Sequence, residues 1–202
     1  FLSDPAPRIQ GWGQGLRSII NAQSPRTDYD WSEYISRFSQ PVVSHEIGQW
    51  CVYPNLEEIS KYDGVMRPAN LEIFRETLQK NGMIHLADSF LLASGKLQAL
   101  CYKADIEAAL RTRNFGGFQL LGLNDFPGQG TALVGVLDAF WEEKGYISPE
   151  EYRRFCAPTV PLARLPKLIY KNNETLKARV EVAHYGETPL KEITAEWTLA
   201  DT

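Results

Sequence analysis

A glutamate at the end of a short apolar run is the first residue of this sequence that could do chemistry. Residues 41–43 are apolar and β-prone, and Ser44, His45 and Glu46 follow them. In parallel α/β folds the loops at the carboxyl ends of the strands form the cleft, so catalytic groups project there. We therefore interpret residues 41–45 as a short buried strand and Glu46 as a candidate catalytic carboxylate. A solvated surface glutamate is the alternative.

A loop with aromatic and amide side chains follows Glu46. It contains Gln49, Trp50 and Tyr53. Sugar rings stack on aromatic side chains, and sugar hydroxyls form hydrogen bonds with amides. These residues are therefore candidate sugar contacts, and packing of the loop is an equal interpretation for Tyr53. Three roles stay open for His45: it orients Glu46, binds a sugar hydroxyl, or packs beneath the loop.

A second apolar run also ends in polar side chains. Residues 117–123 predict a strand, and Asn124 and Asp125 follow it. If the two strands are parallel neighbours, both polar ends lie at the same edge of the sheet, which makes Asn124 and Asp125 candidate substrate contacts. A proline and a glycine at 127–128 make a plain turn the alternative.

The first 30 residues are loop-like, with glycine and proline as punctuation. Trp12 lies between Gly11 and Gly13 in this segment. The glycines do not make a phosphate loop, because neither a preceding strand nor a following Gly-Lys-Ser/Thr is present. Trp12 either stacks on a sugar ring or covers a neighbouring helix.

Helices are expected between the two strands. Residue 68 is a proline suited to the first turn of a helix, and apolar residues then recur at spacings of three and four up to about residue 81. A longer helical region is expected over 84–112, with an apolar stripe along it. Shorter helical segments are expected over 30–38, 56–59 and 133–141, and another beginning at 148–151.

The pattern changes near residue 160. Apolar and polar residues alternate over 168–170, 176–185 and 193–199, and turn residues separate these runs. The sequence therefore predicts an α/β domain over residues 1–158 and the beginning of an all-β sandwich over residues 159–202.

Composition excludes several classes of function. A formal net charge of −4 and the absence of a Lys/Arg cluster argue against nucleic-acid binding. No apolar run is long enough to span a membrane. Three widely spaced cysteines and three histidines have no metal-ligand spacing, so neither a metal nor another cofactor is expected. No Gly-x-Ser-x-Gly motif is present, and the neighbours Ser44 and His45 do not make a hydrolase triad.

Together these pieces resemble the C-terminal part of the catalytic (β/α)8 TIM barrel of glycoside hydrolase family two, the group of β-galactosidase and β-glucuronidase. In that family the seventh strand ends in a Pro-apolar-apolar run, a Glu and then a Gly, as at 41–48. The eighth strand carries Gly-Gly-Phe, as at 116–118, and ends in polar residues, as at 124–125. An immunoglobulin-like sandwich follows the barrel, as from residue 160. Ile47 and Gly48 stand where the family usually has Tyr or Ala-His.

The resemblance implies that residues 1–158 are the C-terminal part of a barrel and that 159–202 begin a truncated sandwich. It makes Glu46 the nucleophile of a retaining exo-glycosidase, with an acid/base carboxyl about 5 Å away on a strand upstream of this fragment. The isolated fragment is then expected to be inactive and to self-associate through an uncovered barrel edge. The candidate substrate contacts are His45, Gln49, Trp50, Asn124, Asp125 and Trp12.

The partner implied by the resemblance is a carbohydrate substrate, and a periplasmic or secreted location is favoured because glycan-degrading relatives are often exported. A second hypothesis is a non-catalytic carbohydrate-binding or pseudo-enzyme module that uses the same aromatic loops. A credible Asn-Glu pair at an upstream strand end of the parent would favour the enzyme, and its absence would favour the binding module.

Overall fold

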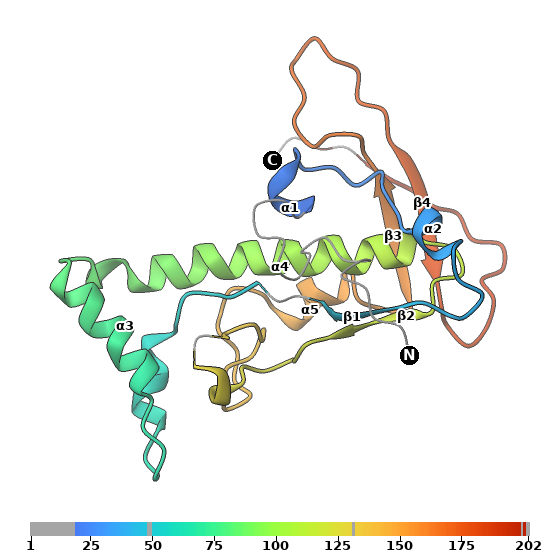
Figure 1. Ribbon diagram of the computed structural model, residues 1–202. Helices are drawn as coiled ribbons and strands as arrows, with labels where there is room; N and C mark the ends of the chain where they lie inside the picture. The colour runs from blue at the N-terminus through green and yellow to red at the C-terminus, as the bar shows by residue number, and fades with distance from the viewer. Residues whose placement is uncertain (1–18, 48–49, 131, 199, 201–202) are drawn as a thin grey trace.

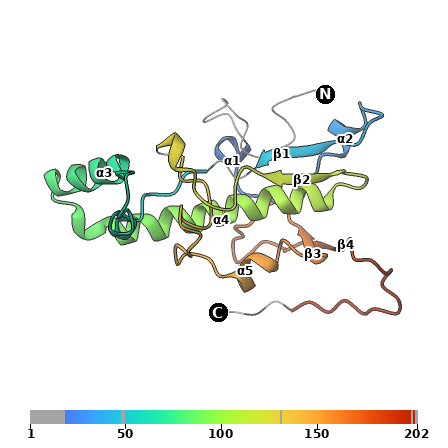
Figure 2. The same ribbon diagram turned by 90° about the horizontal axis from the view of Figure 1, so that it is seen from below.

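A single long helix, α4 (Ala87–Arg111), organises the structure. The computed structural model describes residues 19–47, 50–130, 132–198 and 200 (Figure 1). Figure 2 shows the strands β1 (Val43–Ile47) and β2 (Gly117–Leu120) along one side of α4. On the other side lie α5 (Pro149–Arg153), β3 (Thr159–Arg164) and β4 (Arg179–His184).

The remaining elements are shorter or lie at the far end of α4. They are α1 (Ile19–Ala22), α2 (Ser32–Ile35), the 3-10 helix η2 (Leu56–Lys61), α3 (Ala69–Lys80), the 3-10 helix η3 (Ile84–Leu86) and the 3-10 helix η4 (Pro127–Gln129). The helices expected over 68–81 and 84–112 are confirmed. The helix expected at 148–151 is α5, whose N-terminus carries a capping box between Ser148 and Glu151.

Strands β1 and β2 pair in parallel, with η2, α3 and α4 in the connection between them. Parallel neighbours cannot be joined by a tight turn, which is why a long helical connection separates them in the sequence. The strand predicted over 41–45 is shifted, so Glu46 lies inside β1 and not after it. The prediction that this strand is buried holds for one face only: Ser44 and Ile47 are buried, and Val43 is 50% exposed.

The buried face of the parallel pair packs on α4. Ile47 of β1 forms a core cluster with Tyr102 and Ile106 of α4 and with Phe155, and Phe118 of β2 packs against this cluster. Tyr102 and Ile106 have no exposed surface. Burial of such large apolar side chains contributes about 1.5–3 kcal/mol each, so this cluster fixes the pair on the helix.

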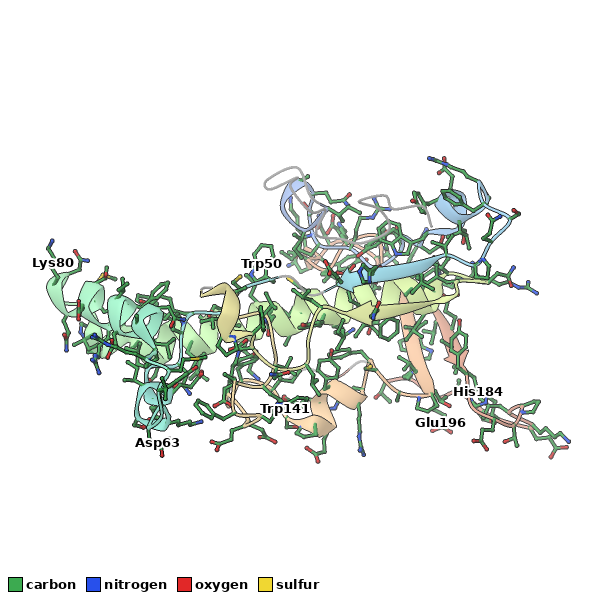
Figure 3. All side chains as sticks on the ribbon, turned by 60° about the horizontal axis from the view of Figure 1, so that its bottom comes forward. Trp50, Asp63, Lys80, Trp141, His184 and Glu196 are labelled. Atoms are coloured by element: carbon green, nitrogen blue, oxygen red, sulfur yellow. The ribbon has the colours of Figure 1, made fainter. Side chains whose placement is uncertain are left out.

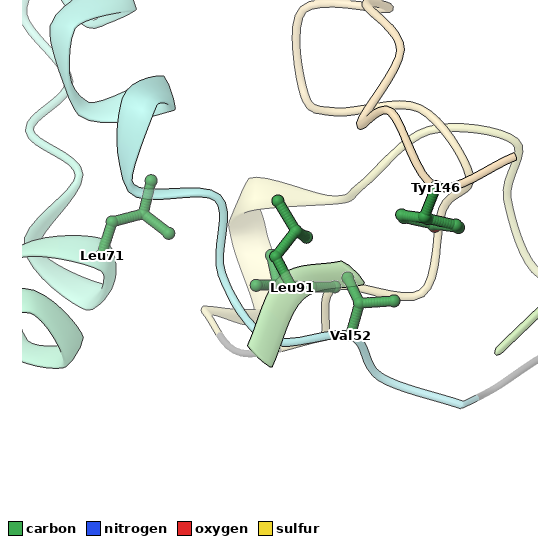
Figure 4. Packing of buried hydrophobic residues seen from close by; sticks show 5 residues of the cluster. Val52, Leu71, Leu91 and Tyr146 are labelled. Atoms are coloured by element: carbon green, nitrogen blue, oxygen red, sulfur yellow. The ribbon is translucent and has the colours of Figure 1, made fainter. Parts of the chain in front are cut away.

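A second core cluster holds the N-terminal half of α4. It brings together Val52, Leu71, Leu91, Leu133 and Tyr146 (Figure 4). The ring of Tyr146 lies directly on the backbone of α4 at Gly95, where a Cβ atom would stand 2.2 Å from Cδ1 of that ring. Glycine at this position lets the ring approach the helix more closely than any other residue would allow.

The helix predicted over 133–141 is wrong. Among the described residues of this segment, Leu137 instead makes isolated β-bridges to Asn124 and Glu143. The Asp138 carboxylate accepts hydrogen bonds from the backbone N–H groups of Phe140 and Glu142, which holds a turn at this point. Aspartate competes in this way with helical hydrogen bonding, and the apolar spacing alone does not reveal it.

The C-terminal part has fewer strands than the alternation predicts. β3 and β4 pair antiparallel, and β4 lies within the predicted run 176–185. No strand forms over 168–170 or over 193–198, because alternation gives a segment no partner for its backbone hydrogen bonds. The β3–β4 sheet docks on the C-terminal end of α4, where Arg164 donates to the carbonyl oxygen of Arg111 at 2.9 Å.

The described residues thus contain two sheets of two strands each. Neither a barrel nor a sandwich is complete at that strand number, so both architectures stay predictions. In the part of the chain that the structure describes, no helix has the length and apolarity to cross a membrane.

We predict that Gly95→Ala destabilises the fold despite the higher helix propensity of alanine. The new methyl group must displace the buried Tyr146 ring, at a cost of about 1–3 kcal/mol in the free energy of unfolding. Urea denaturation measures this change. The control is Ser89→Ala on an exposed position of the same helix, which should leave stability nearly unchanged. Equal or higher stability of Gly95→Ala would contradict the packing described.

Candidate functional site

The backbone at Glu46 is strained. Glu46 has a φ of 54°, in the left-handed region that residues other than glycine rarely adopt. The strand register explains this: Ser44 pairs with Phe118 and Ile47 pairs with Leu120, so two residues of β1 stand opposite one residue of β2. This is a β-bulge, a feature that redirects side chains and is over-represented beside active sites. The Glu46 side chain is 42% exposed.

His45 is the other residue of the bulge, directly before Glu46, and contacts both Glu46 and β2. Its Nδ1 lies 2.7 Å from Oε1 of Gln119, and its Nε2 lies 3.6 Å from Oε1 of Glu46. The structure therefore brings the predicted pair His45 and Glu46 together and adds Gln119, which the sequence did not single out. The signal that could have found Gln119 is the strand register, which places it opposite the bulge.

Trp50 follows the bulge and is half-buried, and its main chain is tied to α4. The Trp50 carbonyl oxygen accepts a hydrogen bond of 2.7 Å from Nε2 of the buried Gln98. Figure 3 shows Trp50 on one side of α4 and Trp141 on the other. The predicted contacts Gln49 and Trp12 lie outside the described residues.

Tyr53 belongs to an apolar pocket and not to a polar one. Its ring stands edge-on to Phe74 of α3, with centroids 5.5 Å apart, and it packs at a tilt against Phe90. An open pocket of about 680 Å³ lies here between α3, α4 and the loop at 51–54. Burial raises the pKa of the Tyr53 hydroxyl. This packing is the alternative role that the sequence left open for Tyr53.

The strand predicted over 117–123 is shorter in the structure: β2 ends at Leu120, so Asn124 and Asp125 lie in the loop beyond it and not directly at its end. The Asp125 side chain also has protein partners. The carboxylate is buried, its Oδ2 lies 2.6 Å from Nζ of Lys144, and its Oδ1 accepts from the Gly135 N–H. Asn124 donates from Nδ2 to the Asp125 carbonyl oxygen at 3.1 Å. The bonds to Lys144 and Gly135 give Asp125 a structural role. Contact of Asn124 and Asp125 with substrate stays a prediction.

The Asp125–Lys144 pair belongs to a buried cluster of charges that the sequence did not reveal. Glu58 of η2 and Asp138 are also buried, and Lys61 lies 2.5 Å from Oδ2 of Asp138. Burial, together with the negative charges of Asp125 and Asp138, raises the pKa of Glu58 to about 7. Nothing in the sequence distinguishes Glu58 from its exposed neighbour Glu57, because only the fold places one of them beside two aspartates.

Within the described ranges, no group of His, Cys, Asp and Glu side chains is arranged to hold a metal ion. The described geometry thus gives two polar groups: the bulge within the parallel pair, with His45, Glu46 and Gln119, and the buried cluster around Asp125 in the loops beyond β2. Only the first presents an accessible carboxylate. Neither a protein-family model nor a curated protein matches this sequence.

We predict that Glu58 makes stability depend on pH near neutrality. Its pKa in the folded state, about 7, lies above the ordinary value of 4.5, so the folded chain binds this proton more tightly than the unfolded chain. Stability should therefore rise as the pH falls from about 8 to about 5, by at most about 3 kcal/mol. Urea denaturation at several pH values measures the slope.

The matched variants are Glu58→Gln and Glu57→Gln. Glu58→Gln should flatten the pH dependence of stability in this window. At pH 8 this variant should be more stable than the unaltered chain, because it removes a buried charge. Glu57→Gln, at an exposed position, should keep the slope of the unaltered chain. An unchanged slope in Glu58→Gln would show that another group causes the dependence.

Proposed function

We propose that Glu46 is the catalytic nucleophile of a retaining exo-glycosidase that hydrolyses O-glycosidic bonds of carbohydrates. The observation that carries this proposal is the strained, accessible carboxylate in the bulge of β1. A left-handed backbone at a glutamate costs about 1–3 kcal/mol, and such strain concentrates at active sites. The family resemblance of the motif around Glu46 supports the same residue.

The face on which the site lies agrees with this proposal. Along β2, Phe118 and Leu120 pack toward the core cluster on α4, so Gln119 between them points away from the helix. His45, which is hydrogen-bonded to Gln119, lies on this same face, the one turned away from α4. In a (β/α)8 barrel the helices cover the outside, and the face turned away from them is the interior. Residues 1–158 as part of a barrel, and 159–202 as the start of a sandwich, therefore remain our proposed architecture.

The proposed reaction has two displacement steps. A Glu46 carboxylate oxygen bonds to the anomeric carbon while the bond from that carbon to the leaving oxygen breaks, and an acid/base carboxyl protonates the leaving oxygen. Water, deprotonated by the same acid/base group, then attacks the anomeric carbon and releases Glu46. By resemblance the acid/base group comes from an upstream barrel strand of a longer parent protein, about 5 Å from Glu46.

The proposed substrate contacts differ in how far the structure supports them. His45 is exposed beside Glu46, and the half-buried Trp50 is held by Gln98 close to the bulge in sequence. His45 is the strongest candidate, because its ring lies beside the Glu46 carboxylate. Trp50 is proposed because an aromatic ring close to the bulge in the sequence can stack on a sugar. Three further residues are proposed as substrate contacts on the basis of the sequence alone: Gln49, Trp12 and Asn124. Asp125 would contact substrate only by exchanging or sharing its bond to Lys144.

We predict that the full-length protein containing these residues is trapped by an activated 2-deoxy-2-fluoro glycoside. The fluorine slows both displacement steps, and the activated leaving group restores the rate of the first step only. The glycosyl-enzyme therefore accumulates. Mass spectrometry of the digested protein should find one labelled peptide, with the sugar on Glu46. A panel of sugars identifies the preferred glycone.

The control variants for this experiment are Glu46→Gln and Glu57→Gln. Glu46→Gln should take no label, and Glu57→Gln, exposed and close in sequence, should be labelled as fully as the unaltered protein. A label on a different carboxylate would contradict the assignment of Glu46. No label with any sugar, together with measurable sugar binding, would contradict an enzymatic function and would favour a non-catalytic carbohydrate-binding module.

A further inference from the structure

Gln119 occupies the position in β2 that faces the bulge. The residue pairs on either side are Ser44 with Phe118 and Ile47 with Leu120, so Gln119 stands opposite both His45 and Glu46. Its neighbours in β2 contribute to the core on α4, whereas Gln119 is exposed on the other face. A glutamine in this place adds nothing to the core, but its amide reaches the residue beside the candidate nucleophile.

The hydrogen bond from His45 to Gln119 fixes the proton arrangement of the imidazole. The Gln119 oxygen Oε1, 2.7 Å from Nδ1, is an acceptor, so Nδ1 carries the proton that is donated to it. The ring is thereby held with Nε2 toward the Glu46 carboxylate, 3.6 Å away. Which nitrogen carries a proton follows from the partner of the other nitrogen, and here that partner is Gln119.

This arrangement fixes where the imidazole ring lies beside the Glu46 carboxylate. Held by Gln119, the ring keeps Nε2 3.6 Å from Oε1 of Glu46 and so limits the positions that the carboxylate can take. Replacing Gln119 by an apolar residue removes the acceptor in β2 that holds the ring in this orientation and keeps the proton on Nδ1. The orientation of the Glu46 carboxylate then loses one of its supports.

From this geometry we infer that Gln119 is a positioning residue, which acts through His45 to hold the Glu46 carboxylate for attack on the anomeric carbon. The inference rests on the proposed function of Glu46. It assigns to β2 a role in the chemistry of β1: the bulge turns Glu46 out of the strand, and the cross-strand bond steadies the residue next to it.

The test measures how fast Glu46 is trapped by the activated 2-deoxy-2-fluoro glycoside in the full-length protein. Gln119→Leu, which removes the acceptor, should lower the limiting trapping rate about ten-fold and should change the half-saturating concentration of the reagent less than about two-fold. Gln119→Glu keeps an oxygen acceptor for Nδ1–H and should restore most of the rate. A purely structural role of Gln119 would not give this separation of rate from affinity.

Gln79→Leu on the exposed face of α3 is the matched control and should be trapped at the unaltered rate. Thermal unfolding of the variants shows whether the fold is retained. If the unaltered protein is labelled on Glu46 and Gln119→Leu is labelled just as fast, the positioning role is wrong while the proposed function stands. If the unaltered protein takes no label on Glu46, the proposed function fails, and the role of Gln119 fails with it.

Discussion

The parallel pairing of β1 and β2 is the constraint on which the rest of this structure depends. Strands that run in the same direction need a connection that returns to the starting edge, and here that connection contains η2, α3 and α4. α4 has 25 residues, about 37 Å at 1.5 Å per residue, and so extends well beyond the short strands it covers. Its C-terminal half carries the parallel pair, and its N-terminal half is left to carry the loops.

A buried polar network on α4 fixes the segments that follow both strands. Gln98 donates to the carbonyl oxygens of Trp50 and Val134, and the Tyr146 hydroxyl donates to Oε1 of Gln98. Tyr102, one turn further along the helix, donates to the same Val134 carbonyl oxygen. Buried carbonyl groups need such partners, so one helix positions the chain after the Glu46 bulge and the loop near Asp125 together.

The sequence predicts those parts of the fold whose signals are local. Pro68 and the apolar spacing after it predict α3, and Ser148 as N-cap with Pro149 at the first helical position predicts the start of α5. The segment at 133–141 has helical spacing too, yet the Asp138 side chain captures backbone N–H groups and forms a turn. Alternation over 193–198 likewise predicts a strand that does not form, because pairing is a property of two segments and not of one.

The candidate site is predictable to a similar degree. Glu46 and His45 stand out because a polar pair ends a β-prone run. The bulge, the left-handed backbone of Glu46 and the contact with Gln119 depend on the register between strands that are far apart in the sequence. The burial of Glu58 beside Asp125 and Asp138 depends on loops that meet only in three dimensions.

Chemical rescue tests the role of Glu46 most directly. In the full-length protein, Glu46→Gly should lose hydrolysis of an aryl glycoside, and added azide should restore turnover by entering the space of the missing carboxylate. Because the azide attacks once from the side of the nucleophile, the product should be a glycosyl azide of inverted anomeric configuration, identified by proton NMR. Full hydrolytic activity of Glu46→Gly, or loss of activity with no azide product, would contradict Glu46 as the nucleophile.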